Sequence, residues 1–130
     1  MQGRECIGVG ANPEVNLETM SMFFKSNLDV LARYQFMPTE EVANILPQGL
    51  PIRTVLGSGD EGIVDLASAI IDREVQRTFY FGSLAVERPE HQLLLRQNNL
   101  TGSSLWFDCG IQQWIDHQRQ EMTRKTRAKN

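Results

Sequence analysis

The hydrophobic pattern of the chain changes its period once, and this change predicts the central elements of the fold. Across Ile63–Ile71 apolar residues recur every three or four positions, which is typical of an amphipathic helix. Ser58 and Glu61 have the spacing of a capping box, so we expect the helix to begin there. Across Val75–Phe81 apolar and polar residues mostly alternate, which predicts a strand.

This strand needs hydrogen-bonding partners, because backbone N–H and C=O groups are rarely left unpaired. The pattern elsewhere predicts no second strand of comparable quality, so we expect pairing with the same strand of a second copy, in a homodimer. Pairing with the weaker segment Ile52–Leu56 is the alternative. The residues expected at the dimer interface are Leu17, Phe24, Leu28, Leu31, Val75, Arg77, Phe79 and Phe81.

The first half of the chain predicts further helices. Asn12 and Pro13 can cap and open a helix whose apolar residues recur to about Phe36. Its apolar stripe is wider than a small core requires, which again favours burial against a second subunit. Thr39 is expected to cap a short second helix that ends before Pro47.

The last third of the chain has the outline of a helix-turn-helix. Pro89 can open a helix, Ser103 or Ser104 can cap a short segment, and Gly110 breaks it before a final helix with a basic end. The predicted fold is therefore mainly α: a small intertwined helical homodimer, one short strand pairing across the dimer, and a helix-turn-helix-like C-terminal part. The expected divisions are a flexible leader at 1–12, a helical dimerisation domain at 13–88 and the helix-turn-helix-like part at 89–130.

Composition is that of a soluble globular protein, with 41% hydrophobic and 22% charged residues among 130. No apolar run is long enough to cross a bilayer and no signal pattern opens the chain, so we expect no membrane partner. Cys6 and Cys109 are the only cysteines, which argues against a disulfide framework and favours a reducing cytoplasm.

The formal net charge of −3 hides a basic C-terminal end on an acidic body. Such an end predicts a localised anionic partner, and phosphate contacts to DNA are one possibility. A solvated C-terminus whose cations suit the helix dipole is the alternative. The candidate DNA-binding residues are Arg119, Arg124, Lys125, Arg127 and Lys129.

Three aromatic residues, Trp106, Phe107 and Trp114, are expected in the core, or as anchors of a partner interface if they are exposed. The sequence offers few candidate catalytic residues. Cys109 and His117 could form a nucleophile–base pair, but packing and surface roles suffice for them. No close-spaced pair of ligands supports a zinc site. We therefore expect no enzyme, no metal and no cofactor.

Several short segments, in order, resemble the FlhD family of transcriptional activator subunits. The similar segments lie between Val15 and Ser83 and are Val15–Leu17, Arg33–Phe36, Glu40–Ala43, Ile63–Ala67 and Val75–Phe81. The resemblance implies a mainly helical intertwined homodimer that acts with a second, zinc-bearing, FlhC-like subunit on DNA, with RNA polymerase as a further candidate partner.

The expected function is thus a non-enzymatic, cytoplasmic subunit of a transcriptional activator complex that binds DNA together with its partner. A different class of protein would share the acidic body and the dimer. This alternative is a small acidic homodimeric interaction protein, such as a secretion chaperone or a phage-type inhibitor, without DNA contact.

Overall fold

A computed structural model describes the backbone of residues 5–129 and the side chains of residues 5–125. Its centre is a four-stranded parallel sheet with the order β2-β1-β3-β4. The strands are β1 (Cys6–Ala11), β2 (Gln35–Pro38), β3 (Arg77–Phe81) and β4 (Ser104–Phe107). The helices are α1 (Leu17–Ser26), α2 (Leu28–Leu31), α3 (Glu40–Ala43), α4 (Gly59–Ile71), α5 (Pro89–Thr101) and α6 (Asp108–Lys129).

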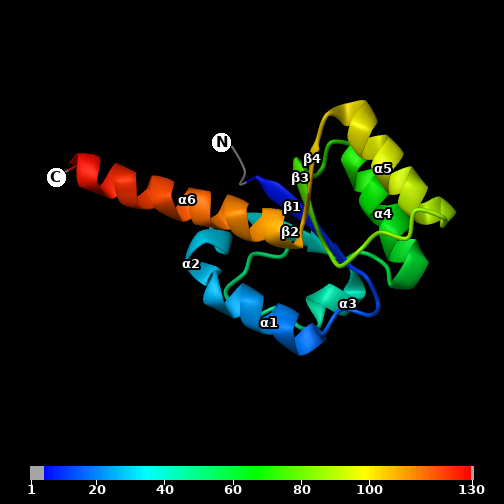
Figure 1. Ribbon diagram of the computed structural model, residues 1–130, viewed down its shortest axis with the longest axis horizontal. Helices are drawn as coiled ribbons and strands as arrows, with labels where there is room; N and C mark the ends of the chain where they lie inside the picture. Colours follow the sequence, from blue (N-terminus) through cyan, green and yellow to red (C-terminus); the bar gives the residue numbers. More distant parts are fainter. Residues whose placement is uncertain (1–4, 130) are drawn as a thin grey trace.

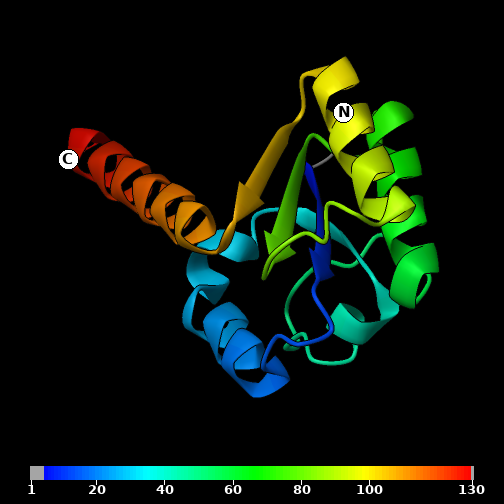
Figure 2. The same ribbon diagram turned by 45° about the vertical axis from the view of Figure 1, so that its right-hand side comes forward.

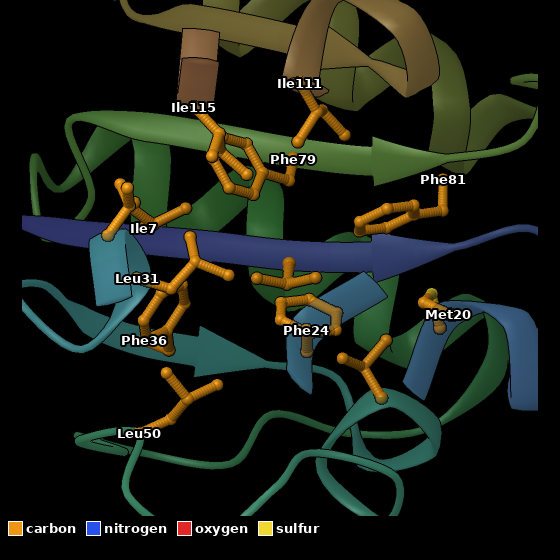
Figure 3. Packing of buried hydrophobic residues seen from close by; sticks show 13 residues of the cluster. Ile7, Met20, Phe24, Leu31, Phe36, Leu50, Phe79, Phe81, Ile111 and Ile115 are labelled. Carbon is orange, nitrogen blue, oxygen red and sulfur yellow. The ribbon is translucent and has the colours of Figure 1, made fainter. Parts of the chain in front are cut away.

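Helices cover both faces of the sheet (Figures 1 and 2). One layer contains α1, α2 and the first half of α6, and the other contains α4 and α5. The C-terminal end of α6 extends away from the body. Figure 3 shows the core of the first layer, in which Ile7, Phe79 and Ile115 lie close together. The predicted mainly α fold is therefore wrong: the chain folds as an α/β protein.

The central strand β1 was predicted as part of a flexible leader, and its glycines explain the error. Ile7 and Val9 are fully buried in the first layer, whereas Gly8 and Gly10 face α4. A Cβ at these two glycines would lie 2.9 and 2.8 Å from methyl carbons of Leu66. The glycines therefore allow α4 to pack directly on the strand, although they weaken the apolar pattern that marks a strand in the sequence.

Strand β3 forms where the alternating pattern predicted it, but its partners lie within the same chain. It pairs in parallel with β1 on one side and with β4 on the other. Phe79 and Phe81 face the first layer, and Thr78 and Tyr80 face the second. Both of its edges are occupied, so a strand pairing across a dimer is excluded for β3. Ile52 forms only an isolated bridge, to Phe36.

The C-terminal part is not a helix-turn-helix. Ser104–Phe107 is an edge strand, and Trp106 lies opposite Phe79 in the sheet. This strand separates α5 from α6, so the two helices do not form the compact crossed pair that the motif requires. The predicted first helix also ends early, because Gln35–Pro38 is strand β2. In the described range, no helix is long and apolar enough to span a membrane.

Candidate ligand-binding site

The order of the strands creates a crevice at one edge of the sheet. From β1 the chain turns to α1 in the first layer, and from β3 it turns to α5 in the second layer. The loops after these adjacent strands therefore diverge. Ligands of open α/β sheets bind at such a point, outside the carboxyl ends of the strands.

A cavity of about 200 Å³ lies at this point, and we call it the edge cavity. Three strand ends and the beginning of α4 contribute to it, together with one side chain from the first turn of α5. The lining residues are Ala11, Asn12, Pro13, Leu17, Thr39, Glu41, Gly59, Asp60, Ile63, Tyr80 and His91. Asn12 also donates a hydrogen bond from Nδ2 to the carbonyl of Ser83 at 2.9 Å, which ties the loops after β1 and β3 together.

Tyr80 is fully buried and carries an unsatisfied polar group. Its ring packs edge-on against His91 and Phe107, with centroid distances of 5.9 and 6.2 Å. Its hydroxyl has no hydrogen-bond partner among the described residues. Burial raises the pKa of this hydroxyl, so it stays protonated at neutral pH. A buried, unpaired hydroxyl costs about 1–3 kcal/mol, and a ligand in the edge cavity could recover this free energy.

His91 lies beside Tyr80 and is held in one tautomer. The backbone N–H of Ala85 donates to its Nδ1 at 2.7 Å, so in the neutral ring the proton is on Nε2. Burial, followed by the charge of Arg88, lowers the pKa of His91. The ring is therefore neutral at pH 7. Among the described residues Nε2 has no hydrogen-bond partner, which leaves it as an N–H donor for a ligand.

Carboxylates surround the beginning of α4. Glu41 accepts a hydrogen bond from the Gly59 N–H at 2.8 Å, and Asp65 accepts one from the Gly57 N–H at 2.9 Å. Arg88 forms an ion pair with Asp60 across the α4 and α5 N-termini. The predicted capping box does not form, since the side chain of Ser58 makes no capping hydrogen bond.

The residues predicted at a dimer interface are mostly inside one subunit. Those fully buried in the first layer are Phe24, Leu31 and Phe79, with Phe81 7% exposed there. Val75 is buried in the second layer, and Leu28 packs against the first. Arg77 pairs with Glu5 at 3.0 Å and stacks on Trp114 at 4.6 Å. Leu17 is 44% exposed and lines the edge cavity. The core of a single chain thus accounts for the wide apolar stripe that predicted a dimer interface.

Two of the three residues predicted at a partner interface pack within this chain. Trp106 and Trp114 pack against the first-layer core. Trp114 contacts Phe79 and Tyr34, with ring centroids 5.6 and 5.3 Å apart. Phe107 is the most exposed of the three predicted aromatics, at 37%.

Two of the predicted DNA-binding side chains of α6, those of Arg119 and Arg124, form ion pairs within the chain. Arg119 forms a bidentate ion pair with Asp29, with both N–H···O distances at 2.9 Å. It also donates a hydrogen bond to Asn27 at 2.9 Å. Arg124 pairs with Glu121, and Lys125 is exposed. The side chains of Arg127 and Lys129 lie outside the described residues.

The candidate nucleophile–base pair does not assemble. Cys109 and His117 lie on the same helix, α6, eight positions apart, which corresponds to about 12 Å along the axis. His117 instead lies 4.0 Å from Glu121. Among the described residues no three His, Cys, Asp or Glu side chains form a potential metal site.

Sequence reasoning missed Glu41, Tyr80 and His91 as site residues. They come from three separate elements, and each reads locally as a surface, strand or helix residue. One signal could have indicated the region. An apolar run with alternating glycines, Cys6–Ala11, is followed by Asn12 and Pro13, which is compatible with a buried strand entering a loop.

The lowered pKa of His91 predicts a pH dependence of stability. Unfolded His91 titrates near 6.5, and in the folded protein it binds its proton less tightly. The stability that neutral His91 contributes is fully present above pH 6.5 and is lost as the pH falls through 6.5 to the folded-state pKa. Urea unfolding at about pH 7.5, 6.5 and 5.5 should show this loss.

The matched variant for this measurement is His91→Asn, whose side-chain oxygen can still accept the Ala85 N–H. Carboxylates whose protonation in acid destabilises the fold, such as that of Asp29 beside Arg119, are present in both proteins. The difference between the two pH profiles therefore isolates His91. Identical profiles would contradict the assignment of a buried neutral ring.

Comparisons with known proteins found a likeness among the solved structures. No family model matches the chain, and no curated protein matches it. Among solved structures it is similar to the crystal structure of methylglyoxal synthase from Elizabethkingia anophelis NUHP1, with a TM-score of 0.69 and 16% identity. The match covers 86% of this chain and 76% of that one.

This likeness and the parallel sheet overturn the FlhD resemblance. The activator function with its DNA-binding role is wrong as well, and so is the alternative of a small acidic homodimeric interaction protein such as a secretion chaperone or a phage-type inhibitor. At 16% identity the likeness shows the fold alone. The chain thus has the α/β fold of that synthase structure, and its chemistry must be argued from its own edge cavity.

Proposed function

We propose that this protein binds a small, polar, uncharged metabolite in the edge cavity. The observation that carries the proposal concerns Tyr80, a residue that lines the cavity and whose buried hydroxyl has no hydrogen-bond partner among the described residues. Native proteins rarely leave such a group unpaired, and a ligand hydrogen bond is one way to satisfy it. The likeness to a methylglyoxal synthase supports the proposal only through the fold, because sheets of this type bind ligands at this edge.

The polar groups of the cavity define what the ligand must offer. His91 presents an N–H donor, so the ligand needs an acceptor on that side. Tyr80 can donate or accept. The carboxylates of Asp60 and Glu41 are acceptors, so the ligand also needs N–H or O–H groups. A molecule with both kinds of group, such as a polyol, an amide or a nucleobase, fits this set.

The volume limits the ligand to a small molecule. About 200 Å³ corresponds to the liquid volume of about seven water molecules at about 30 Å³ each. This lies below the usual range for drug-sized ligands, about 300–1,000 Å³. A single sugar ring or a single nucleobase is the appropriate size.

The test uses Tyr80→Phe, which removes one oxygen atom and keeps the packing. Without ligand, we expect the free energy of unfolding of the variant to be about 1 kcal/mol higher than that of the parent, because the unpaired hydroxyl is gone. A screen of neutral polyols, nucleobases and amides by ligand-observed NMR should find binders of the parent. The same binders should be about tenfold weaker for the variant, since they lose a hydrogen bond worth about 1.4 kcal/mol.

The matched control is Tyr34→Phe, because Tyr34 is partly buried in the first layer beside Trp114 and does not line the edge cavity. It should leave the affinity for these ligands unchanged. A Tyr80→Phe protein that binds them as well as the parent, and is no more stable, would refute the proposal.

A further inference from the structure

The beginning of α4 is where the edge cavity could attract an anion. α4 is a helix of 13 residues, and its first N–H groups carry partial positive charge. A Cβ built at Gly59 would have no atom within 4 Å, so there is open space beside this residue. Gly59 itself lines the cavity. A ligand in the cavity could therefore approach this helix terminus.

A side chain of the protein already occupies the anion position. Glu41 comes from α3, 18 positions before Gly59, and its Oε2 accepts the Gly59 N–H at 2.8 Å. Ser58, the residue type that usually caps a helix, makes no side-chain hydrogen bond there. The carboxylate thus takes both the capping role and the place where an anionic ligand would lie.

The remaining charges of the cavity have the same sign. Asp60 lines it together with Glu41. The nearby cation Arg88 is engaged by Asp60 and lies 3.8 Å from Glu90. Among the described lining residues no Lys or Arg is present to offset the carboxylates. A phosphate or carboxylate group entering here would meet two like charges and no free helix N–H at Gly59.

We propose that Glu41 determines the specificity of the edge cavity, by occupying the anion position at the start of α4 and thereby excluding phosphorylated and carboxylated ligands. The ligands that remain are neutral molecules with an N–H or O–H group directed at Glu41 or Asp60. This inference rests on the proposed function for the nature of the natural ligand. The exclusion of anions rests on the contact between Glu41 and Gly59 and on the carboxylates of the cavity lining.

The test is the gain of phosphate binding when Glu41 is removed. In Glu41→Ala the Gly59 N–H is free, and we expect about 10 mM inorganic phosphate to raise Tm by about 5 °C if Kd is about 1 mM. The parent should show no rise at the same ionic strength set with chloride. Phosphate should also shift the Gly59 amide resonance in the variant and leave it in place in the parent.

Glu40→Ala is the matched control, since Glu40 belongs to the same helix, is exposed and does not line the cavity. It should behave as the parent does. Glu41→Gln keeps the length of the side chain without its charge, and it should respond to phosphate more weakly than Glu41→Ala. If the alanine variant does not fold, the response of Glu41→Gln to phosphate serves as the test.

Two results would overturn the inference: a parent that binds phosphate as well as Glu41→Ala does, or variants that show no response to phosphate. Both results are independent of the neutral-ligand screen and of the Tyr80→Phe comparison, which test the proposed function. Conversely, phosphate binding gained by Glu41→Ala would support the role of Glu41 even if no neutral ligand were found for the parent.

Discussion

Replacing Phe79 with Ala should lower the free energy of unfolding by about 3–5 kcal/mol, the usual cost of removing a buried phenyl ring. Phe79 is fully buried and lies between β1 and α6 in the first-layer core (Figure 3). Its ring also meets Trp114 edge-on, with centroids 5.6 Å apart. The cavity left behind would be bounded by strands on both sides of β3, so it cannot collapse easily.

Urea unfolding followed by circular dichroism, at two protein concentrations about tenfold apart, would measure this loss. The loss should be the same at both concentrations, because Phe79 packs within one subunit. Phe107→Ala is the control, since Phe107 is on the neighbouring strand and is 37% exposed. It should cost markedly less. A loss that vanished at the higher concentration would restore the idea that Phe79 lies at an interface between copies.

Replacing Gly62 with Ala should destabilise the protein by about 1–3 kcal/mol, although alanine favours helices by about 1 kcal/mol over glycine. Gly62 lies inside α4 and is buried. A Cβ there would lie 2.5 Å from the carbonyl oxygen of Gly57 and 2.9 Å from the Cγ2 of Thr39. Backbone cannot move aside as easily as a side-chain end, so the loop before α4 must shift.

The same substitution should also affect the edge cavity, because Thr39 and Gly59 line it. We expect weaker binding of any ligand found in the neutral screen. Ser68→Ala provides the control, since Ser68 is exposed on the same helix, and its effect should stay within about 0.5 kcal/mol. Thermal and urea unfolding of the three proteins would measure this. A Gly62→Ala protein more stable than the parent would show that the contact between α4 and its preceding loop is loose.

The sequence by itself determined the elements whose own residues show a clear hydrophobic period. The helical period of Ile63–Ile71 and the alternation of Val75–Phe81 correctly predicted α4 and β3. The helix opened by Pro89 was also predicted. A final helix was predicted too, but it begins at Asp108, so Gly110 lies inside it and is not the predicted break. Local periodicity suffices in these cases, because a period of 3.6 or of two residues distinguishes a helix from a strand without any contact to a distant part of the chain.

Only the tertiary structure decided the rest, because the responsible contacts join distant parts of the chain. β1 is hidden by two glycines whose use becomes clear only once Leu66 lies on them. β2 and β4 have four residues each, too few to establish a period, and their pairing with β1 and β3 makes them strands. The edge cavity likewise exists only where Glu41, Tyr80 and His91 are brought together by the reversal of strand order.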